Sequence, residues 1–183
     1  DRSVELGNTE FGYVKGVAWG DFNNDGRHDL YVSVLGGDNL LFRNDGRRAR
    51  PGPRGEEWQF TNVAKAAGVR GPAESFSTWF WDYDNDGWED LYVAGYKLTN
   101  LSDVVALHLG EPALTALSRL YRNNHDGTFE DVTHAVRFGR VALPMGSNFG
   151  DLDNDGWLDV YIGNGEPWLG TLIPNRLFRN AEG

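Results

Sequence analysis

Short apolar runs, rich in β-branched and aromatic residues, recur along the chain after acidic, glycine-containing stretches. Runs of this composition favour strands, and the three longest read LYVSVL from Leu30, LYVAGY from Leu91 and VYIGNG from Val160. Each is followed by a shorter strand pattern that ends in an Arg-Asn pair, at residues 40–44, 119–123 and 176–180. A further strand is predicted after the first two pairs, as WQFTNVA from Trp58 and TFEDVT from Thr128. The pattern predicts an all-β protein.

The strand patterns repeat with a long period. The acidic stretches begin 61 residues apart, from Asp21 to Asp82, and then 69 residues apart, from Asp82 to Asp151. A period of this size indicates a repeated supersecondary unit, and a four-stranded antiparallel sheet per unit is the blade of a β-propeller. We therefore predict one β-propeller segment over residues 1–183 with about three blades. These are expected at about 14–64, at about 75–133 with an insertion over 97–118, and at about 145–183 without the outer strand.

Both ends of the sequence fall at the same phase of the repeat. Asp1, Asn62 and Asp131 each lie 20 residues before an acidic stretch, so we expect the chain to begin at the tail of a fourth strand. Known propellers use about four or more blades, and open ends leave edge strands unpaired. The pattern therefore predicts three blades of a larger or assembled propeller. They are either a piece of a longer chain or a subunit that joins its copies head to tail.

The acidic stretches share a nine-residue pattern with Asp or Asn at positions 1, 3, 5 and 9 and Gly at position 6. They read DFNNDGRHD at 21–29, DYDNDGWED at 82–90 and DLDNDGWLD at 151–159. Side chains at positions 1, 3, 5 and 9 and the backbone carbonyl at position 7 supply oxygens to a hard cation, and Gly allows the sharp turn. The pattern predicts three Ca²⁺ sites with these ligand residues: Asp21, Asn23, Asp25, Arg27, Asp29, Asp82, Asp84, Asp86, Trp88, Asp90, Asp151, Asp153, Asp155, Trp157 and Asp159.

The loops differ from an EF-hand, which needs a Glu at position 12 and flanking helices. Position 12 is instead Val32, Val93 or Ile162, and the flanks are predicted strands. A turn without metal is the alternative, because Asx-turns favour the same residues. However, a turn needs one such residue, whereas four crowded acidic or amide side chains repel one another without a cation. The first loop carries Asn23 in place of a third-position Asp, so weaker binding is expected there.

The charge balance is explained mostly by these loops. The chain has 17 Lys+Arg and 27 Asp+Glu, a net charge of −10, and eleven of the acids occupy predicted ligand positions. Three bound Ca²⁺ would bring the net charge to about −4. This acidity argues against nucleic acid as a partner. There is no Cys, so no disulfide framework is expected, and no apolar run approaches the length of a membrane span.

Other repeated residues predict packing rather than chemistry. Aromatic residues at a fixed phase predict an inter-blade core: Trp19, Phe80 and Phe149, and Tyr31, Tyr92 and Tyr161. The Arg-Asn pairs are expected to bind backbone at blade turns. The four His residues lack zinc-site spacing, and no Ser lies in a G-x-S-x-G elbow. We therefore expect the protein not to be an enzyme.

Four segments together resemble a known family. AWGDFNNDGRHDLYVS, WFWDYDNDGWEDLYVAGY, RLYRNNHDGTFEDVT and NFGDLDNDGWLDVYIGNG resemble the FG-GAP/VCBS-type repeats of the ASPIC/UnbV (cartilage acidic protein-like) family. Integrin α-subunit propellers carry similar calcium hairpins. The resemblance covers nearly the whole chain and implies a calcium-stabilised propeller on an extracellular, cell-surface or periplasmic protein. It assigns metal ligands to the three loops only.

Three functions follow from this sequence. The first is a calcium-stabilised extracellular scaffold or binding module for protein or glycan contacts, with neighbouring blades of the same or another chain as partners. The second is a self-assembling structural subunit whose copies share strands head to tail. The third is a polysaccharide-active enzyme, which needs a cleft with paired carboxylates or a Lys/Tyr/His set away from the loops.

Overall fold

The fold is nearly all-β, as predicted. The computed structural model describes residues 12–49, 55–97, 102, 105–106, 109, 111, 116–140, 142–165 and 173–182. Within them the chain forms three antiparallel sheets and the short helix α1 (Ala64–Ala67), and residues 102, 105 and 106 are also helical. Most of the insertion predicted at 97–118 lies outside the described residues.

The first two sheets have four strands each and the same order. Every strand pairs antiparallel with the one before it, as in a propeller blade. The first sheet consists of β1 (Tyr13–Gly20), β2 (Asp29–Leu35), β3 (Leu40–Ala49) and β4 (Glu56–Asn62). The second consists of β5 (Ser75–Trp81), β6 (Asp90–Gly95), β7 (Arg119–Asn123) and β8 (Phe129–Asp131).

The third sheet has three strands among the described residues. It consists of β9 (Pro144–Gly150), β10 (Asp159–Asn164) and β11 (Arg176–Phe178), with β10 in the middle. By its position, β11 corresponds to β3 and β7. In the described part of the chain, β11 has no partner strand equivalent to β4 or β8.

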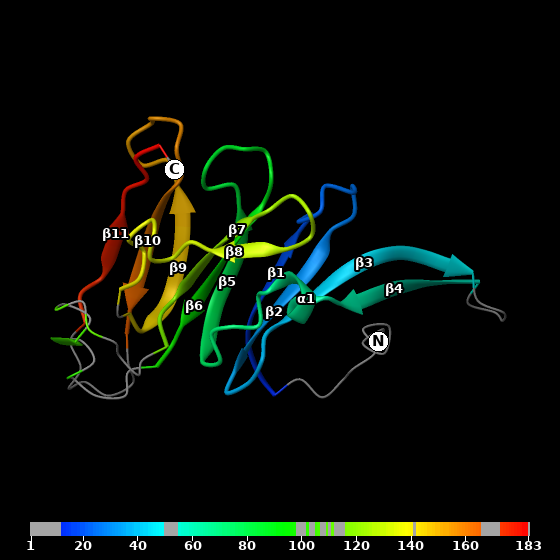
Figure 1. Ribbon diagram of the computed structural model, residues 1–183, viewed down its shortest axis with the longest axis horizontal. Helices are drawn as coiled ribbons and strands as arrows, with labels where there is room; N and C mark the ends of the chain where they lie inside the picture. Colours follow the sequence, from blue (N-terminus) through cyan, green and yellow to red (C-terminus); the bar gives the residue numbers. More distant parts are fainter. Residues whose placement is uncertain are drawn as a thin grey trace.

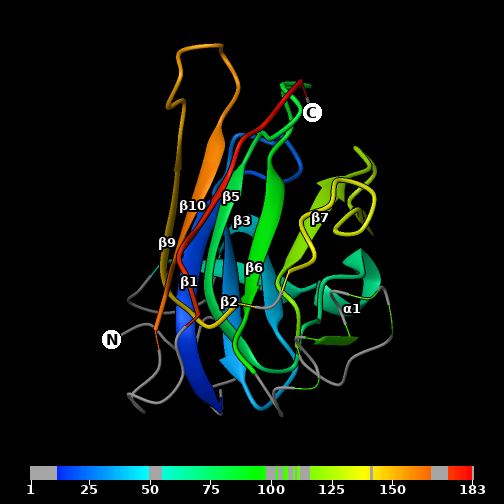
Figure 2. The ribbon, with the colours of Figure 1, turned by 90° about the vertical axis from the view of Figure 1, so that its left-hand side faces the viewer.

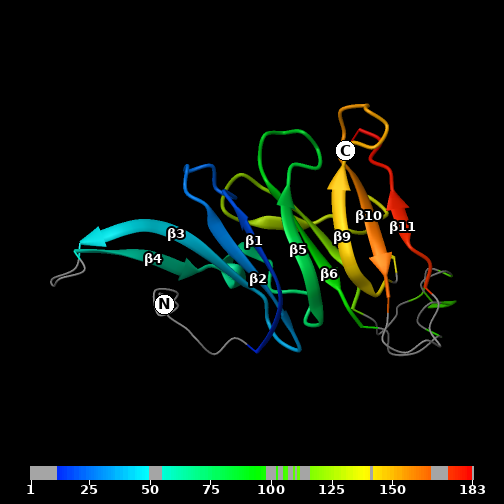
Figure 3. The ribbon, with the colours of Figure 1, turned by 180° about the vertical axis from the view of Figure 1, so that it is seen from behind.

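The sheets stand side by side, with the second between the other two (Figure 1). Their first strands, β1, β5 and β9, are neighbours when the molecule is seen from behind (Figure 3). The first and second sheets approach closely at Gly16, where an added Cβ would lie 2.7 Å from the carbonyl oxygen of Phe76. Only Gly fits that contact. At the second junction, the ring of Phe149 lies 6.0 Å from that of Trp79.

Each junction between sheets contains its own hydrophobic core. The first is built around Tyr31, Leu41, Phe80 and Leu91, and α1 closes it with Ala64 and Ala67 at its outer end. The second is built from side chains of the second and third sheets and of the turn after β8, namely Trp81, Tyr83, Tyr92, Ala94, Leu120, Val132, Phe138, Ala142, Val160 and Ile162. The packing therefore repeats with the sequence.

The predicted inter-blade aromatic core is confirmed for Tyr31, Tyr92 and Phe80 and is wrong for Trp19 and Tyr161 at the two ends. Phe149 contacts Trp79 but stays 36% exposed. Tyr31 and Tyr92 are fully buried, and Phe80 is 7% exposed. Trp19 is 57% exposed, although it shares the phase of Phe80, and Tyr161 is 47% exposed, although it shares the phase of Tyr92. The reason is that no further sheet covers β1 or β10 among the described residues, so these two side chains lack the surface that buries their counterparts.

Candidate metal centre

Each acidic loop joins the first two strands of a sheet. The ladder pairs Gly20 with Asp29 in the first sheet, and the equivalent residues pair in the other two. The fourth residue of every loop is an Asn with positive φ, between 53° and 59°. The Gly at position 6 has φ between 82° and 91°, a left-handed conformation that Gly adopts without steric cost. All three sequences therefore fold into the same turn.

Hydrogen bonds inside the loops hold two carboxylates facing inward. The Asp82 carboxylate accepts the N–H groups of Asp86 and Gly87, at 3.0 and 2.9 Å. The Asp86 carboxylate in turn accepts the Trp88 N–H at 2.8 Å. Loops one and three repeat these bonds at the same positions. This orientation comes from the backbone and does not need a metal.

The second and third loops bring three carboxylates together. Asp82, Asp84 and Asp86 each offer an oxygen within 4.8 Å of the others, and Asp151, Asp153 and Asp155 do the same. Such spacing suits a hard divalent cation, which takes several carboxylate oxygens at once. Two acidic clusters that could hold metal ions are therefore present at equivalent places in neighbouring sheets.

The third-position carboxylate shows the fit to a cation most clearly. Asp84 Oδ1 is buried and has no hydrogen-bond partner among the described residues. Burial, with Asp86 and Asp82 nearby, raises the pKa of Asp84. A buried oxygen without a donor is costly, and a cation in the cluster would supply the missing partner.

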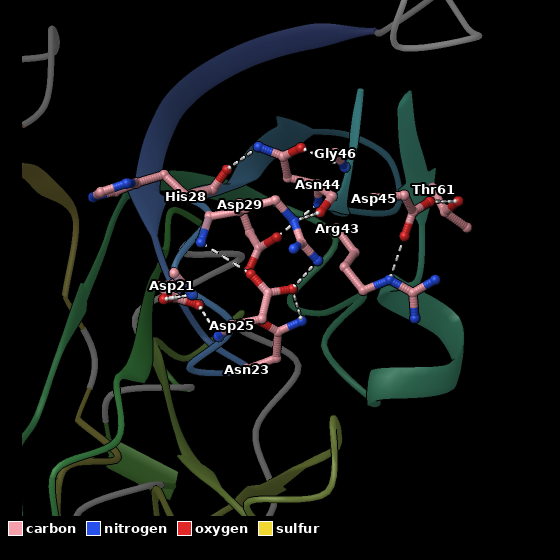
Figure 4. Close-up of polar contacts among 12 residues, drawn as sticks. Asp21, Asn23, Asp25, His28, Asp29, Arg43, Asn44, Asp45, Gly46 and Thr61 are labelled. Carbon is pink, nitrogen blue, oxygen red and sulfur yellow. Dashed lines mark hydrogen bonds and ion pairs between the residues drawn. The ribbon is translucent and has the colours of Figure 1, made fainter. Parts of the chain in front are cut away.

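The first loop is organised differently (Figure 4). Asn23 Nδ2 donates to Asp25 Oδ2 at 2.9 Å, and Arg27 Nη2 lies 2.5 Å from the same oxygen. Arg27 Nε also donates to the carbonyl of Asn44 at 2.7 Å. In the first loop, therefore, a cationic side chain of the loop itself pairs with the fifth-position carboxylate, whereas in the other two loops the basic partner of this carboxylate lies outside the loop.

The ninth-position aspartates stand apart from the acidic clusters. Asp90 is fully buried; its Oδ1 accepts the Asn123 N–H at 2.8 Å and its Oδ2 accepts the Tyr83 N–H at 3.0 Å. Asp159 makes the equivalent pair of bonds. Burial raises the pKa of Asp90 to about 7. These carboxylates tie the loop to the third strand of the same sheet.

Asp29 is the ninth-position residue of the first loop. Its Oδ1 accepts the Asn44 N–H at 2.7 Å, whereas its Oδ2 is buried without a partner among the described residues. Burial raises its pKa to about 6. The first loop therefore also contains one uncompensated buried oxygen, although it forms no cluster of three carboxylates like those of the other loops.

Basic side chains from the segments just after the third strands approach the acidic loops. His125 Nε2 lies 2.7 Å from Asp86 Oδ2, and its ring stacks on Trp88 at 4.7 Å. Arg179 binds Asp153 at 2.6 Å and Asp155 at 3.0 Å. The expectation that the Arg-Asn pairs bind backbone is confirmed for Asn. It is wrong for Arg, because the Arg side chains bind carboxylates.

The Asn residues connect neighbouring sheets, which the sequence prediction missed. Asn123 Nδ2 donates to the carbonyl of Phe22 in the first loop at 2.7 Å, and Asn180 Nδ2 donates to that of Tyr83 in the second loop at 2.7 Å. The fourth-position residues Asn24 and Asn85 donate to the Gly carbonyl of the next loop. The three loops therefore form one hydrogen-bonded row, and the signal for it was the repetition of these Asn residues.

The fold and the loops together define a class: a repeat protein whose propeller-type blades each carry an acidic hairpin loop. The model of the FG-GAP-like repeat matches the chain twice, over residues 21–93 and 82–162, which covers more than half of its length. The chain therefore belongs to the FG-GAP-like repeat family. No curated protein matches it. Proteins with FG-GAP repeats are typically extracellular modules, and within the described residues no helix has the length and apolar character needed to span a bilayer.

Proposed function

We propose that the acidic loops are Ca²⁺ sites and that the protein is a calcium-stabilised extracellular scaffold or binding module for protein or glycan contacts. The observation that carries the proposal is the convergence of three carboxylates in loops two and three, with Asp84 Oδ1 buried and unpartnered among the described residues. Oxygen ligands in a flexible loop suit Ca²⁺ better than metals that prefer sulfur or imidazole.

The residues at positions 1, 3 and 5 would hold the ion, with the backbone carbonyl at position 7. The Asp at position 9, which the sequence also predicts as a ligand, is not among the clustered carboxylates of loops two and three. The cation would neutralise the crowded carboxylates and tie off the hairpin. If the affinity matches that of extracellular modules, with Kd about 10⁻⁴ to 10⁻³ M, each site adds about 0.4 to 1.4 kcal/mol at millimolar calcium. Such sites are loaded outside cells, which supports an extracellular, cell-surface or periplasmic location.

The order of affinity should follow the loops. We propose full sites in loops two and three and a weaker site in loop one, where Asn23 removes one charge and Arg27 already neutralises Asp25. The finer kinship with ASPIC/UnbV and VCBS-type proteins is part of this proposal, and it rests on the loop segments and the FG-GAP-like match.

Head-to-tail assembly is the second candidate function. Val17 is 58% exposed and Trp19 is 57% exposed on β1, the surface to which a preceding blade would pack. Apolar exposure of this kind favours a protein partner. We propose no enzyme activity: the cavity between the second and third sheets has mostly apolar walls, with Arg179 as its one charged lining residue.

Thermal unfolding in millimolar calcium and in excess EGTA tests the metal proposal. Three sites should raise the Tm by about 3 to 15 °C. Asp84→Asn should reduce this gain, because it removes a charge from the cluster of loop two. The matched control Glu130→Gln changes an exposed acid on β8 that pairs with Arg122, and it should leave the calcium gain unchanged. Equal Tm values in the two buffers would overturn the proposal. Measuring the molecular mass of the same samples in solution tests the head-to-tail assembly.

A further inference from the structure

The outer end of the third sheet borders an apolar cavity. Its volume is about 200 Å³, and it lies between β11 and the side chains that the second sheet turns toward the third. A cavity of about 150 Å³ is already large enough for a benzene ring. Most of the lining is apolar, and Trp81 Nε1, which belongs to a lining residue, is buried without a hydrogen-bond partner among the described residues.

The equivalent space between the first two sheets is filled by an aromatic side chain from the fourth strand. Phe129 of β8 is 8% exposed, and its ring lies 5.8 Å from that of Phe22. It packs with Leu41, Val69 and Tyr121. The residues that line the cavity at the second junction hold the same places in the repeat, namely Tyr83, Leu120, Phe138 and Phe178. The cavity is therefore the position that a Phe129 equivalent would occupy.

The charges on β11 match the same missing strand. On β7, Arg119 binds Asp131 of β8 at 2.8 Å, and Arg122 binds Glu130 of β8 at 2.8 Å. Their counterparts are Arg176 and Arg179. Arg176 Nε is buried without a partner among the described residues.

Arg179 reaches into the third loop, where it binds Asp153 and Asp155. Leu177, which follows Arg176 on β11, is 57% exposed because no further sheet faces it among the described residues, whereas its counterpart Leu120 is 2% exposed in the core between the second and third sheets. Figure 2, which views the molecule from the side of the third sheet, shows how β11 runs along that end of the molecule.

We propose that β11 binds an extended peptide segment in which Phe is followed by two acidic residues. The segment adds antiparallel to β11 in the register of β7 and β8, where Arg122 faces Glu130 and Asn123 faces Phe129. Backbone hydrogen bonds then provide the pairing, as in strand addition. The Phe ring enters the cavity, and the two acids meet Arg179 and Arg176. This inference does not rest on the proposed calcium function, but the acid that faces Arg179 competes for it with Asp153 and Asp155.

A synthetic peptide with the sequence of residues 126–133, DGTFEDVT, tests the proposal. Fluorescence anisotropy of the labelled peptide with the full chain should show saturable binding, in EGTA as well as in calcium. A peptide with the F129S change should bind about ten- to a hundredfold more weakly, because it no longer buries a phenyl ring. Arg176→Gln in the protein should weaken binding of the unchanged peptide several-fold.

Hydrogen exchange locates the bound peptide, which should slow exchange of the β11 amides. Weak binding can be detected with a fusion in which the octapeptide is attached after Gly183 through a flexible linker. Tethering raises the local peptide concentration to millimolar. This version should have a higher Tm than the same fusion with F129S. Equal binding of the two peptides, protection away from β11, or equal Tm values of the two fusions would overturn the proposal. Dimers of the chain that Arg176→Gln dissociates would also overturn it, in favour of a second copy as the occupant.

Discussion

The first acidic loop and the second are built on the same turn but manage their charges in different ways. In the second loop, Asp82, Asp84 and Asp86 converge, and one buried oxygen has no donor among the described residues. In the first loop, Arg27 neutralises the charge of Asp25, and Asn23 donates a hydrogen bond to the same carboxylate. The two loops thus share the backbone turn, whereas the negative charge available to bind a cation depends on the side chains at positions 3 and 7.

This difference separates two roles within one nine-residue pattern. Positions 4, 6 and 9 shape the loop and anchor it to its own sheet in all three copies, and position 4 also binds the next loop in the first two. Positions 3, 5 and 7 set the local charge. If the loops bind Ca²⁺ as proposed, a copy of the repeat can therefore lose part of its metal affinity and keep its fold.

The largest loss of stability is expected when the ninth-position Asp that anchors the loop to the third strand is removed. Asp90→Ala leaves the N–H groups of Asn123 and Tyr83 without acceptors, so it should cost about 2 to 6 kcal/mol of unfolding free energy even in EGTA. Asp29→Ala removes one such acceptor and should cost about half as much. Urea unfolding of both variants in EGTA measures the difference. A loss for Asp90→Ala that appears only in calcium would contradict the anchoring role.

The second largest loss of stability is expected at the junction between the first two loops. Glu89 Oε2 accepts the Asp21 N–H at 2.6 Å, and the equivalent residue of the third loop is Leu158. Glu89→Leu makes the two junctions alike and should cost about 1 to 3 kcal/mol, because a part-buried N–H loses its acceptor. Glu89→Gln keeps an acceptor and serves as the control. Similar urea midpoints for the two variants would argue against this bond.

Converting the first loop into the second sharpens the comparison directly. The double variant Asn23→Asp/Arg27→Trp should bind Ca²⁺ at loop one about tenfold more tightly, since a unit charge at about 4 Å contributes roughly 1 to 4 kcal/mol. Calorimetric calcium titration measures the affinity. Arg27→Gln alone separates the removal of the internal cation from the gain of the carboxylate. An unchanged titration of the double variant would show that positions 3 and 7 do not set the affinity.

The smallest change in stability and calcium affinity is expected when Arg179 beside the third loop is replaced. Arg179 is exposed and binds Asp153 and Asp155. Arg179→Gln should raise the calcium affinity of this loop a few-fold and change the free energy of unfolding in EGTA by less than about 1 kcal/mol, because exposed ion pairs contribute little. Arg43→Gln is a matched control at the same place in the first sheet, where the Arg pairs with Asp45. Lower affinity in the Arg179→Gln variant would mean that the guanidinium assists binding.

Much of the site was predictable because its information is local. Gly at position 6 and Asp at positions 1 and 5 specify a turn that folds within nine residues, and the β-branched runs on either side specify the hairpin. The third strand was equally clear from RLYRN and its copies. The sequence did not reveal that Arg27 neutralises Asp25, because the residue also fits the ordinary role of a solvated side chain at position 7.

The sequence by itself determined the all-β class, the repeat, the position of the three loops and the residues at their predicted ligand positions, since each depends on neighbours within one hairpin. Tertiary structure alone decided which aromatic residues are buried, because burial of Tyr92 and exposure of Tyr161 depend on whether another sheet lies opposite. It also decided that Asp90 anchors β7 and that the cavity beside β11 matches the space filled by Phe129. These features join residues from different strands and sheets, and only the packing of one sheet against another brings them into contact.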